Sequence, residues 1–325
     1  MFEYGTQYVH APRVKGNSGD WMNLGAGVGL IAPAGIVGTF NSPGSTFFVD
    51  IFAGDNANAG TDPTIPFQTL AYALTQCTND RDDRIIIMDA WNEATPIAIN
   101  ISRVHILGLS ANPERPYPVW TATGDTNIFT LSDACNSCEI AYMDFGGGAT
   151  SAGIGMGVST PMGVVIHHCT FGNGWAGGDT PAYGILCPVA GNATGLAIVA
   201  CQFRGTGGNA GGVITIDGIH MTMGVNLGGR ITNCILMGCP GVAINMAVNG
   251  DSFVIAENII ACDADTQGSA ITLSATTLGC LVTGNKAMFG DAAGGMVQNP
   301  YLDLAAAGSN HWAANMKGAA FIDPA

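Results

Sequence analysis

Charged residues are scarce in this sequence. Asp, Glu, Lys and Arg make up 10% of the 325 residues, against about a quarter in typical globular proteins, whereas 47% are hydrophobic. A disordered chain would show the opposite balance, so we expect an ordered fold, and 47 glycines with 15 prolines predict many turns. A surface with so little charge suits contact with other copies of the chain or with a partner.

Basic residues are the scarcest charged class, ten against 24 acidic residues, for a net charge of −14. Without a basic stripe, such a chain would be repelled by a phosphate backbone, so we expect no nucleic-acid partner. The first 30 residues lack the pattern of a secretion signal, and the nearby apolar run Val28–Val37 is too short to span a bilayer. We therefore expect no membrane partner. The ten irregularly spaced cysteines predict buried thiols in a protein made in a reducing compartment.

A short strand unit recurs along the chain. It has two apolar residues two apart, then Cys or Asn three residues further on, and usually an apolar residue two after that. The unit occupies residues 138–145, 164–171, 196–203, 229–236, 253–260 and 280–287, and more loosely 102–109. A second set of strands is expected between these units, at 183–186, 212–216, 241–245 and 269–273. Each turn of the chain thus holds at least two strands, joined by loops of unequal length.

A resemblance to a known superfamily agrees with this repeat. Residues 48–63, which contain Gly54-Asp55 and Gly60-Thr61, lead into an amphipathic segment at 66–74, and apolar strands follow at 83–87 and 104–108. This order resembles the opening of pectate-lyase-like β-helix proteins, in which a strand and a loop lead to a helix that covers the first coil. The resemblance implies a fold and not an activity.

We therefore predict an all-β, right-handed parallel β-helix with an N-terminal capping helix and irregular arms at both ends. Residues 1–46 form an N-terminal arm for attachment or oligomer contact. Residues 47–110 hold the capping strand, the helix and the first coil, residues 111–298 hold the remaining coils, and residues 299–325 form a C-terminal arm or cap.

The Cys or Asn position of the repeat is expected to form a structural ladder. In the superfamily that the chain resembles, this position often stacks asparagines inside a bend. Coils lie about 4.8 Å apart, so the residues of one column would stack side by side, in an orientation that a disulfide would have to distort. A functional thiol or a metal role is the alternative. The ladder is predicted at Cys169, Cys201, Cys234, Asn258 and Asn285.

No active site stands out in the sequence. The enzymes of the superfamily cut acidic polysaccharides with clustered carboxylates, calcium and a basic residue, or with paired aspartates beside His and Arg. Asp217 and His220 make the most site-like group, but they lack a second aspartate of that pattern, so we expect a loop contact and keep catalysis as the alternative. His167 and His168 are expected to face outward or lie in a bend, with a ligand role as the alternative. We expect no cofactor and no metal.

The predicted arms are rich in glycine and carry aromatic anchors, which would either rest on a neighbouring subunit or cap the ends of the β-helix. These anchors are Tyr4, Tyr8, Trp21, Phe40, Trp312 and Phe321.

These features favour a non-enzymatic structural protein of a bacteriophage virion, most of all a capsid decoration or a spike. Such a protein would be made in the bacterial cytoplasm, assemble as a homo-oligomer such as a trimer, and contact the major capsid protein or another virion protein. A tail-spike enzyme or glycan-binding module of pectate-lyase-like fold, with Trp175 as a sugar platform, is one alternative. A self-assembling surface or matrix protein is the other.

Overall fold

The computed structural model divides the chain into two compact units, residues 1–44 and 45–325. In the first unit it describes one antiparallel pair, β1 (Ile31–Ala32) with β2 (Gly35–Ile36). The predicted anchors Tyr4, Tyr8, Trp21 and Phe40 lie outside the described residues. The structure describes residues 31–32, 35–36, 44–89, 96–109, 118–120, 125–146, 151–156, 161–172, 181–188, 194–205, 214–222, 226–262, 269–289, 300–317 and 320–321.

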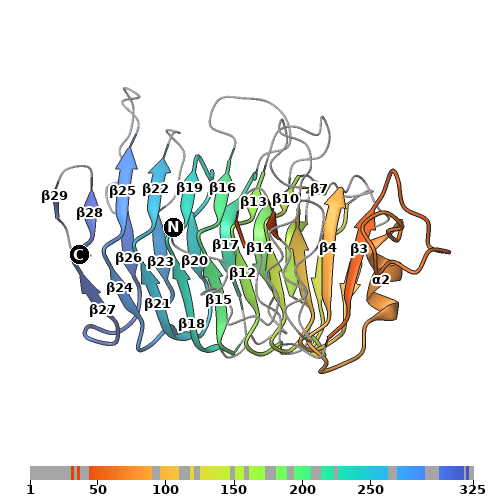
Figure 1. Cartoon of the computed structure of the whole chain (residues 1–325). Helices are drawn as coiled ribbons and strands as arrows, with labels where there is room; N and C mark the ends of the chain where they lie inside the picture. The colour runs from red at the N-terminus through yellow and green to blue at the C-terminus, as the bar shows by residue number, and fades with distance from the viewer. Residues whose placement is uncertain are drawn as a thin grey trace, which may run out of the picture. The chain divides into compact units, whose positions relative to one another are not determined.

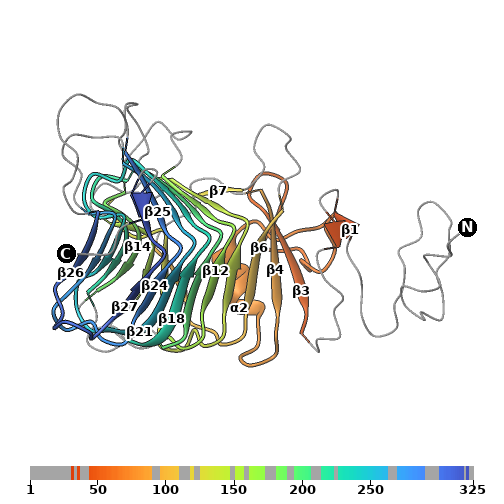
Figure 2. The ribbon, with the colours of Figure 1, turned by 90° about the vertical axis from the view of Figure 1, so that its left-hand side faces the viewer.

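The described strands of the second unit form three sheets of parallel strands (Figures 1 and 2). The first sheet contains β3 (Thr46–Asp50), β4 (Arg84–Asp89), β6 (His105–Gly108), β9 (Glu139–Ala141), β12 (Val165–His167), β15 (Leu196–Val199), β18 (Asn226–Thr232), β21 (Gly250–Ala256), β24 (Leu281–Thr283) and β27 (His311–Ala313). The second contains β7 (Val119–Trp120), β10 (Asp144–Phe145), β13 (Thr170–Phe171), β16 (Gln202–Arg204), β19 (Ile235–Met237), β22 (Ile259–Cys262), β25 (Lys286–Phe289) and β28 (Met316–Lys317), with β29 (Ala320–Phe321) antiparallel at its edge. The third contains β5 (Ile97–Ile99), β8 (Phe129–Leu131), β11 (Ala152–Met156), β14 (Tyr183–Cys187), β17 (Asp217–Met221), β20 (Ile244–Met246), β23 (Ile271–Leu273) and β26 (Tyr301–Asp303).

The chain passes through the first, second and third sheets in turn and then begins the next coil, so each complete coil holds three strands. The predicted right-handed parallel β-helix is confirmed, and its hand is the one that parallel crossovers adopt almost without exception. The sequence predicted at least two strands in each coil. It did not separate the first-sheet strand from the second-sheet strand, because the bend between them is so short that both fall within one repeat unit. Within the described ranges, the structure contains no helix with the length and apolar composition of a membrane span.

Parallel register stacks equivalent side chains into columns, and these columns form the core. The inward column of the first sheet is isoleucine in coil after coil, and every member is fully buried. The second sheet contributes an aromatic column in which the Phe145 and Phe171 rings stack at 5.1 Å and the Phe171 and Phe203 rings at 4.8 Å. Branched and aromatic side chains pack well on such pleated surfaces. The isoleucine column consists of Ile85, Ile106, Ile140, Ile166, Ile198, Ile231 and Ile255, continued by Val282.

The predicted capping helix is α2 (Leu70–Gln76), which lies beside the first strands (Figure 1). Thr69 caps its N-terminus, because the Thr69 hydroxyl accepts a hydrogen bond from the Tyr72 amide at 3.2 Å. Asn56, from the preceding loop, accepts the Thr69 amide at 3.1 Å and so fixes the start of the helix. Leu70 and Leu74 are buried in the core beneath the helix.

Three sequence expectations are corrected by the strand register. The coils continue past residue 298, because β26, β27 and β28 extend all three sheets. Trp312 therefore does not anchor an arm: it pairs in register with Val282 and is half-buried. Phe321 lies in β29, beside β28. In the loosely matched unit at 102–109, Leu107 pairs with Ala141, two residues earlier than the repeat suggested. The third correction, at residues 212–216, concerns the site described below.

Candidate functional site

The bend between the first and second sheets repeats one two-residue turn. Its first residue has a left-handed backbone, with φ of +52° at His168 and Ala200 and +67° at Gly284. The next residue turns its side chain inward, where it is buried. These pairs are Tyr142–Met143, His168–Cys169, Ala200–Cys201, Asn233–Cys234, Glu257–Asn258, Gly284–Asn285 and Ala314–Asn315.

The structure places the five predicted ladder residues one above another in this bend. The Asn285 side-chain oxygen accepts the Asn258 backbone amide at 3.1 Å, and its side-chain nitrogen donates to the Ile255 carbonyl at 2.9 Å. Asn258 bonds the Cys234 amide and the Ile231 carbonyl in the same way, at 2.9 and 3.0 Å. Each asparagine therefore joins neighbouring coils through both of its polar atoms.

The cysteines of the ladder provide only the donor half of this pattern. The sulfurs of Cys169 and Cys201 lie 3.7 Å from carbonyl oxygens of the preceding coil, and that of Cys234 lies at 3.8 Å. Burial and the hydrogen bond with Cys169 raise the pKa of the Cys201 thiol well above its ordinary value. A thiol with a raised pKa is a poor nucleophile, so this arrangement favours the structural reading of the ladder.

Asn315 extends the ladder by one further residue, which sequence reasoning missed. It accepts the Asn285 amide at 3.1 Å and donates to the Val282 carbonyl at 2.9 Å. The signal was present, because Trp312 and Asn315 repeat the spacing of Val282 and Asn285.

A cluster of polar side chains lies on the outward face of the first sheet. Glu139 is its centre: one carboxylate oxygen lies 2.6 Å from His105 Nδ1 and the other 2.7 Å from His167 Nε2. These hydrogen bonds, that of His105 first and that of His167 next, lower the pKa of Glu139 to about 2. The chain of contacts continues through His105 to Asp82, 3.8 Å away, and Asp82 also pairs with Arg103. Sequence reasoning missed Glu139 and His105, because only the register shows that they are direct neighbours.

The two consecutive histidines of the sequence lie at the edge of this cluster. His167 ends β12 on its outward side, and His168 is the left-handed residue of the bend. Their Nδ1 atoms are 2.8 Å apart. The Tyr142 ring stacks on His168 with centroids 5.1 Å apart, and burial followed by the charge of His167 lowers the pKa of His168. Among the described residues, no three His, Cys, Asp or Glu side chains converge in a geometry that could hold a metal ion.

Asp217 and His220 are brought together, but in a strand and not in the expected loop. The expected strand at 212–216 is wrong, because Tyr183 of β14 pairs in register with Asp217, so the strand of this coil is β17. Asp217 is buried and accepts the Val242 amide at 2.5 Å, the Asn245 side chain at 3.0 Å and His220 Nδ1. A carboxylate that accepts a hydrogen bond from Nδ1 holds an imidazole in the orientation for proton transfer at Nε2. The same hydrogen bond also gives a buried carboxylate a partner, which is a purely structural role.

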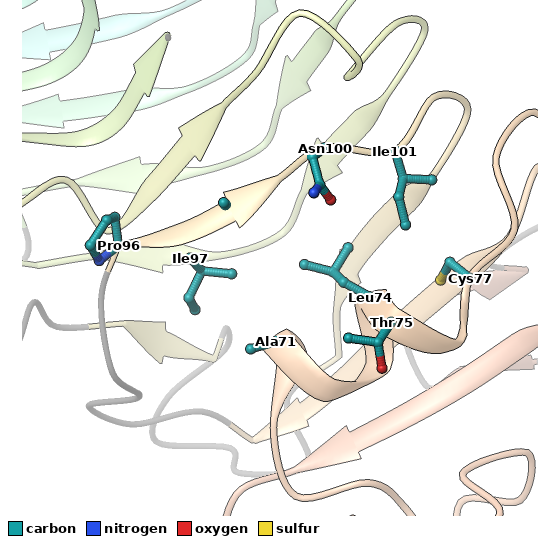
Figure 3. Close-up of a pocket in the computed structure, with 9 residues that line it drawn as sticks. Ala71, Leu74, Thr75, Cys77, Pro96, Ile97, Asn100 and Ile101 are labelled. Atoms are coloured by element: carbon teal, nitrogen blue, oxygen red, sulfur yellow. The ribbon is translucent and has the colours of Figure 1, made fainter.

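Two hollows lie elsewhere on the second unit. A pocket of about 410 Å³ separates α2 from the edge strand β5, and Figure 3 shows Leu74, Cys77, Ile97 and Ile101 at its walls. Burial raises the pKa of the Cys77 thiol there to about 12. A shallow groove of about 410 Å³ crosses the outward face of the first sheet, lined by Val165, Gly195, Leu196, Ala197, Gly229, Arg230, Thr232 and Val254. The Asp217 and His220 pair lines neither hollow.

Comparisons with known proteins bear on the fold alone. No protein-family model matches the sequence, and a search of curated proteins finds no match. Among solved structures, a rhamnogalacturonan lyase is similar with a TM-score of 0.45 at 11% identity, over 84% of this chain and 87% of the lyase. The ORF18 protein of Geobacillus virus E2 gives 0.36 at 11% identity, over 84% of this chain and 60% of the viral protein. The GH136 lacto-N-biosidase from Eubacterium ramulus gives 0.31 at 10% identity, over 83% and 68%.

These structural neighbours include a phage protein and two carbohydrate-active enzymes. The fold is established by the chain's own geometry: three parallel sheets, a left-handed bend that repeats from coil to coil, and an asparagine ladder inside that bend. The chain therefore has a right-handed parallel β-helix fold.

Proposed function

We propose that this chain is a structural protein of a bacteriophage particle, a capsid decoration or a spike, with the β-helix as its stiff body. Residues 1–46 attach it to the particle, through contact with the major capsid protein or another virion protein. The chain acts as a homotrimer, because flat β-helix faces pack side by side around a threefold axis.

The observation that carries this proposal is the outward column of the first sheet. Beyond Glu139 the register runs through Val165, Ala197 and Arg230 to Val254 and Leu281. Val254 and Leu281 are apolar although each is 37% exposed, an exposure at which a charged side chain would also fit. A continuous weakly charged strip of this kind is typical of a surface that another protein covers.

The body also has the stiffness that a projecting or shell-bound protein needs. From β6–β8 to β24–β26 each coil is bonded to the next along three sheets, and the ladder adds buried hydrogen bonds inside the bend. Stacked units that contact only their neighbours gain stability with each added coil.

Two measurements test the proposal. Mass spectrometry of purified phage particles from the source of the chain should find this chain at a fixed stoichiometry, and particles without it would refute the virion role. Light scattering should give three times the 33.2 kDa mass of the chain. The double variant Val254→Glu with Leu281→Glu should reduce that mass to one copy, whereas Phe52→Glu, at a 72% exposed position, should not.

A second candidate function is a carbohydrate-active enzyme or glycan-binding module, favoured by the pairing of Asp217 with His220. Burial of the carboxylate and its hydrogen bond to Nδ1 hold the imidazole in one orientation, as a general base requires. Turnover of a capsular or polyuronate glycan that is lost in His220→Gln and kept in His311→Gln would establish it. If neither a capsular nor a polyuronate glycan is turned over while the chain is incorporated normally into particles, only the structural role remains supported.

A further inference from the structure

We propose that three copies of the chain pack side by side with the corner between the first and second sheets at the threefold axis. The first-sheet face of one copy then meets the second-sheet face of the next. This inference rests on the homotrimer of the proposed function and names the two surfaces that form it. Around a threefold axis each interface joins two different faces, because a face that meets its own copy closes a dimer. The first-sheet strip therefore needs a complementary face.

Exposed apolar side chains identify the second sheet as that face. Within the described strands of the second unit, four large apolar residues are at least 36% exposed, and all four lie in two adjacent coils. Val254 and Leu281, each 37% exposed, lie on the first sheet. Ile259 and Met288, 36% and 46% exposed, lie on the second sheet. None of the four lies on the third sheet, so the apolar surface extends around a single corner.

The apolar residues of the two faces lie at matching levels along the body. Val254 of β21 and Ile259 of β22 belong to one coil, and Leu281 of β24 and Met288 of β25 belong to the next. Rotation about an axis parallel to the body shifts no residue along it, so each coil meets the same coil of the neighbouring copy. The apolar residues of both faces would therefore meet, and they would form the apolar centre that an interface requires.

The corner between these two sheets is compact enough to approach an axis. Only Glu257 and Asn258 separate β21 from β22, and only Gly284 and Asn285 separate β24 from β25. Both asparagines turn inward and are buried. The corner between the third and first sheets differs, because residues 274–280 connect β23 to β24 there. A longer connection would keep neighbouring copies apart, so the first and second sheets are the pair that can come together at an axis.

Charges at the compact corner favour the same packing. Glu257 lies where the first-sheet face ends, and Lys286 lies where the second-sheet face begins. Both are exposed, and neither forms an ion pair within the described part of the chain. In the proposed packing, the edge of each face nearest the axis meets the corresponding edge of its neighbour. Glu257 of one copy then lies close to Lys286 of the next, and opposite charges at this position favour the contact.

The test uses two variants of the full-length chain, each with one face blocked. Val254→Glu with Leu281→Glu blocks the first-sheet face, and Ile259→Glu with Met288→Glu blocks the second-sheet face. Light scattering should give the mass of one copy for each variant alone. An equimolar mixture, well above the concentration at which the unmodified chain becomes a trimer, should give two copies. Each variant keeps the face that the other has lost, so a single intact interface can form.

The matched control is Thr272→Glu with Leu302→Glu, which changes outward positions of the third sheet in the same two coils and should remain a trimer. Far-ultraviolet circular dichroism checks that each variant is folded, and serine replaces glutamate at the same positions in a variant that is not.

Three results would overturn the inference while the unmodified chain is a trimer: a trimer with the second-sheet face blocked, a monomer in the third-sheet control, or a mixture that stays monomeric. A monomeric unmodified chain would instead refute the homotrimer of the proposed function, and this inference with it. Mass spectrometry of phage particles tests the virion role separately from both.

Discussion

Replacing Asn285 with alanine tests whether the ladder stabilises the fold. The side chain is fully buried and takes part in four hydrogen bonds to neighbouring coils: from the Asn258 amide and side chain, and to Ile255 and Asn315. The Asn258 side chain keeps its bond to the carbonyl of the preceding coil, and the Asn315 side chain keeps the backbone amide of residue 285. The Asn258 amide loses its partner, and the Ile255 carbonyl loses the bond from the Asn285 side chain.

A buried amide left without a partner costs about 1–3 kcal/mol and each further hydrogen bond that is lost costs about 1 kcal/mol, so Asn285→Ala should lower the free energy of unfolding by about 4 kcal/mol. Asn285→Cys installs the residue that the chain itself uses at Cys234 and should cost about half as much, because a thiol is still a weak donor. Thr283→Ala, two residues earlier and outward on β24, is the control and should stay within about 0.5 kcal/mol. Guanidinium unfolding followed by circular dichroism measures all three. A loss below about 1 kcal/mol for Asn285→Ala would refute the reasoning.

Three further predictions concern other parts of the body. Because the pKa of Glu139 is lowered to about 2, its carboxylate stabilises the fold above its ordinary pKa near 4.5, and this stability is lost as the pH falls between these values. In Glu139→Gln, the loss of unfolding free energy between pH 6 and pH 2 should be smaller by on the order of 3 kcal/mol at most, as urea unfolding midpoints across this range would show. The same pH dependence in the variant and the unmodified chain would contradict the prediction. Ala200→Gly should raise the free energy of unfolding by about 1 kcal/mol, because Ala200 has φ of +52° and glycine adopts this backbone without strain. Gly284→Ala should lower it by a similar amount, and thermal melts that show the opposite sign for either variant would contradict the prediction. Phe171→Ala opens a gap in the aromatic column and should cost about 3–5 kcal/mol in the same melts, and a loss under about 1 kcal/mol would show that the column closes around the gap.

The fold was predictable because the residues that repeat in the sequence are those of the core and of the bend. An apolar residue at Ile198 and a Cys three residues later recur in coil after coil, since parallel register stacks equivalent positions. The loop from Gly54 to Thr61 and the helix that follows it mark the beginning of the body. Strand limits were harder to place wherever both a loop and a strand were apolar. Ile214 and Ile216 read as a strand, although the strand begins at Asp217.

The polar cluster could not be read from the sequence in the same way. Outward positions vary from coil to coil, so no repeat marks Glu139, and 34 residues separate it from His105. Their contact follows from register alone. His167 and His168 were noticed as a pair, but the 2.8 Å approach of their nitrogens depends on the left-handed backbone at His168, which composition does not reveal. Asn315 was overlooked because the C-terminal coil was taken for an arm.

The change from sulfur to amide along the ladder makes the body uneven in strength from one end to the other. At Cys169, Cys201 and Cys234 the contacts between coils span 3.7–3.8 Å, whereas at Asn258, Asn285 and Asn315 they span 2.9–3.1 Å. In a stack whose units touch only their neighbours, opening begins where the coupling is weakest. Backbone amides near Cys201 should therefore exchange with deuterated water sooner than those near Asn285. By the same reasoning, we expect the C-terminal coils to form first during folding and the remaining coils to add to them.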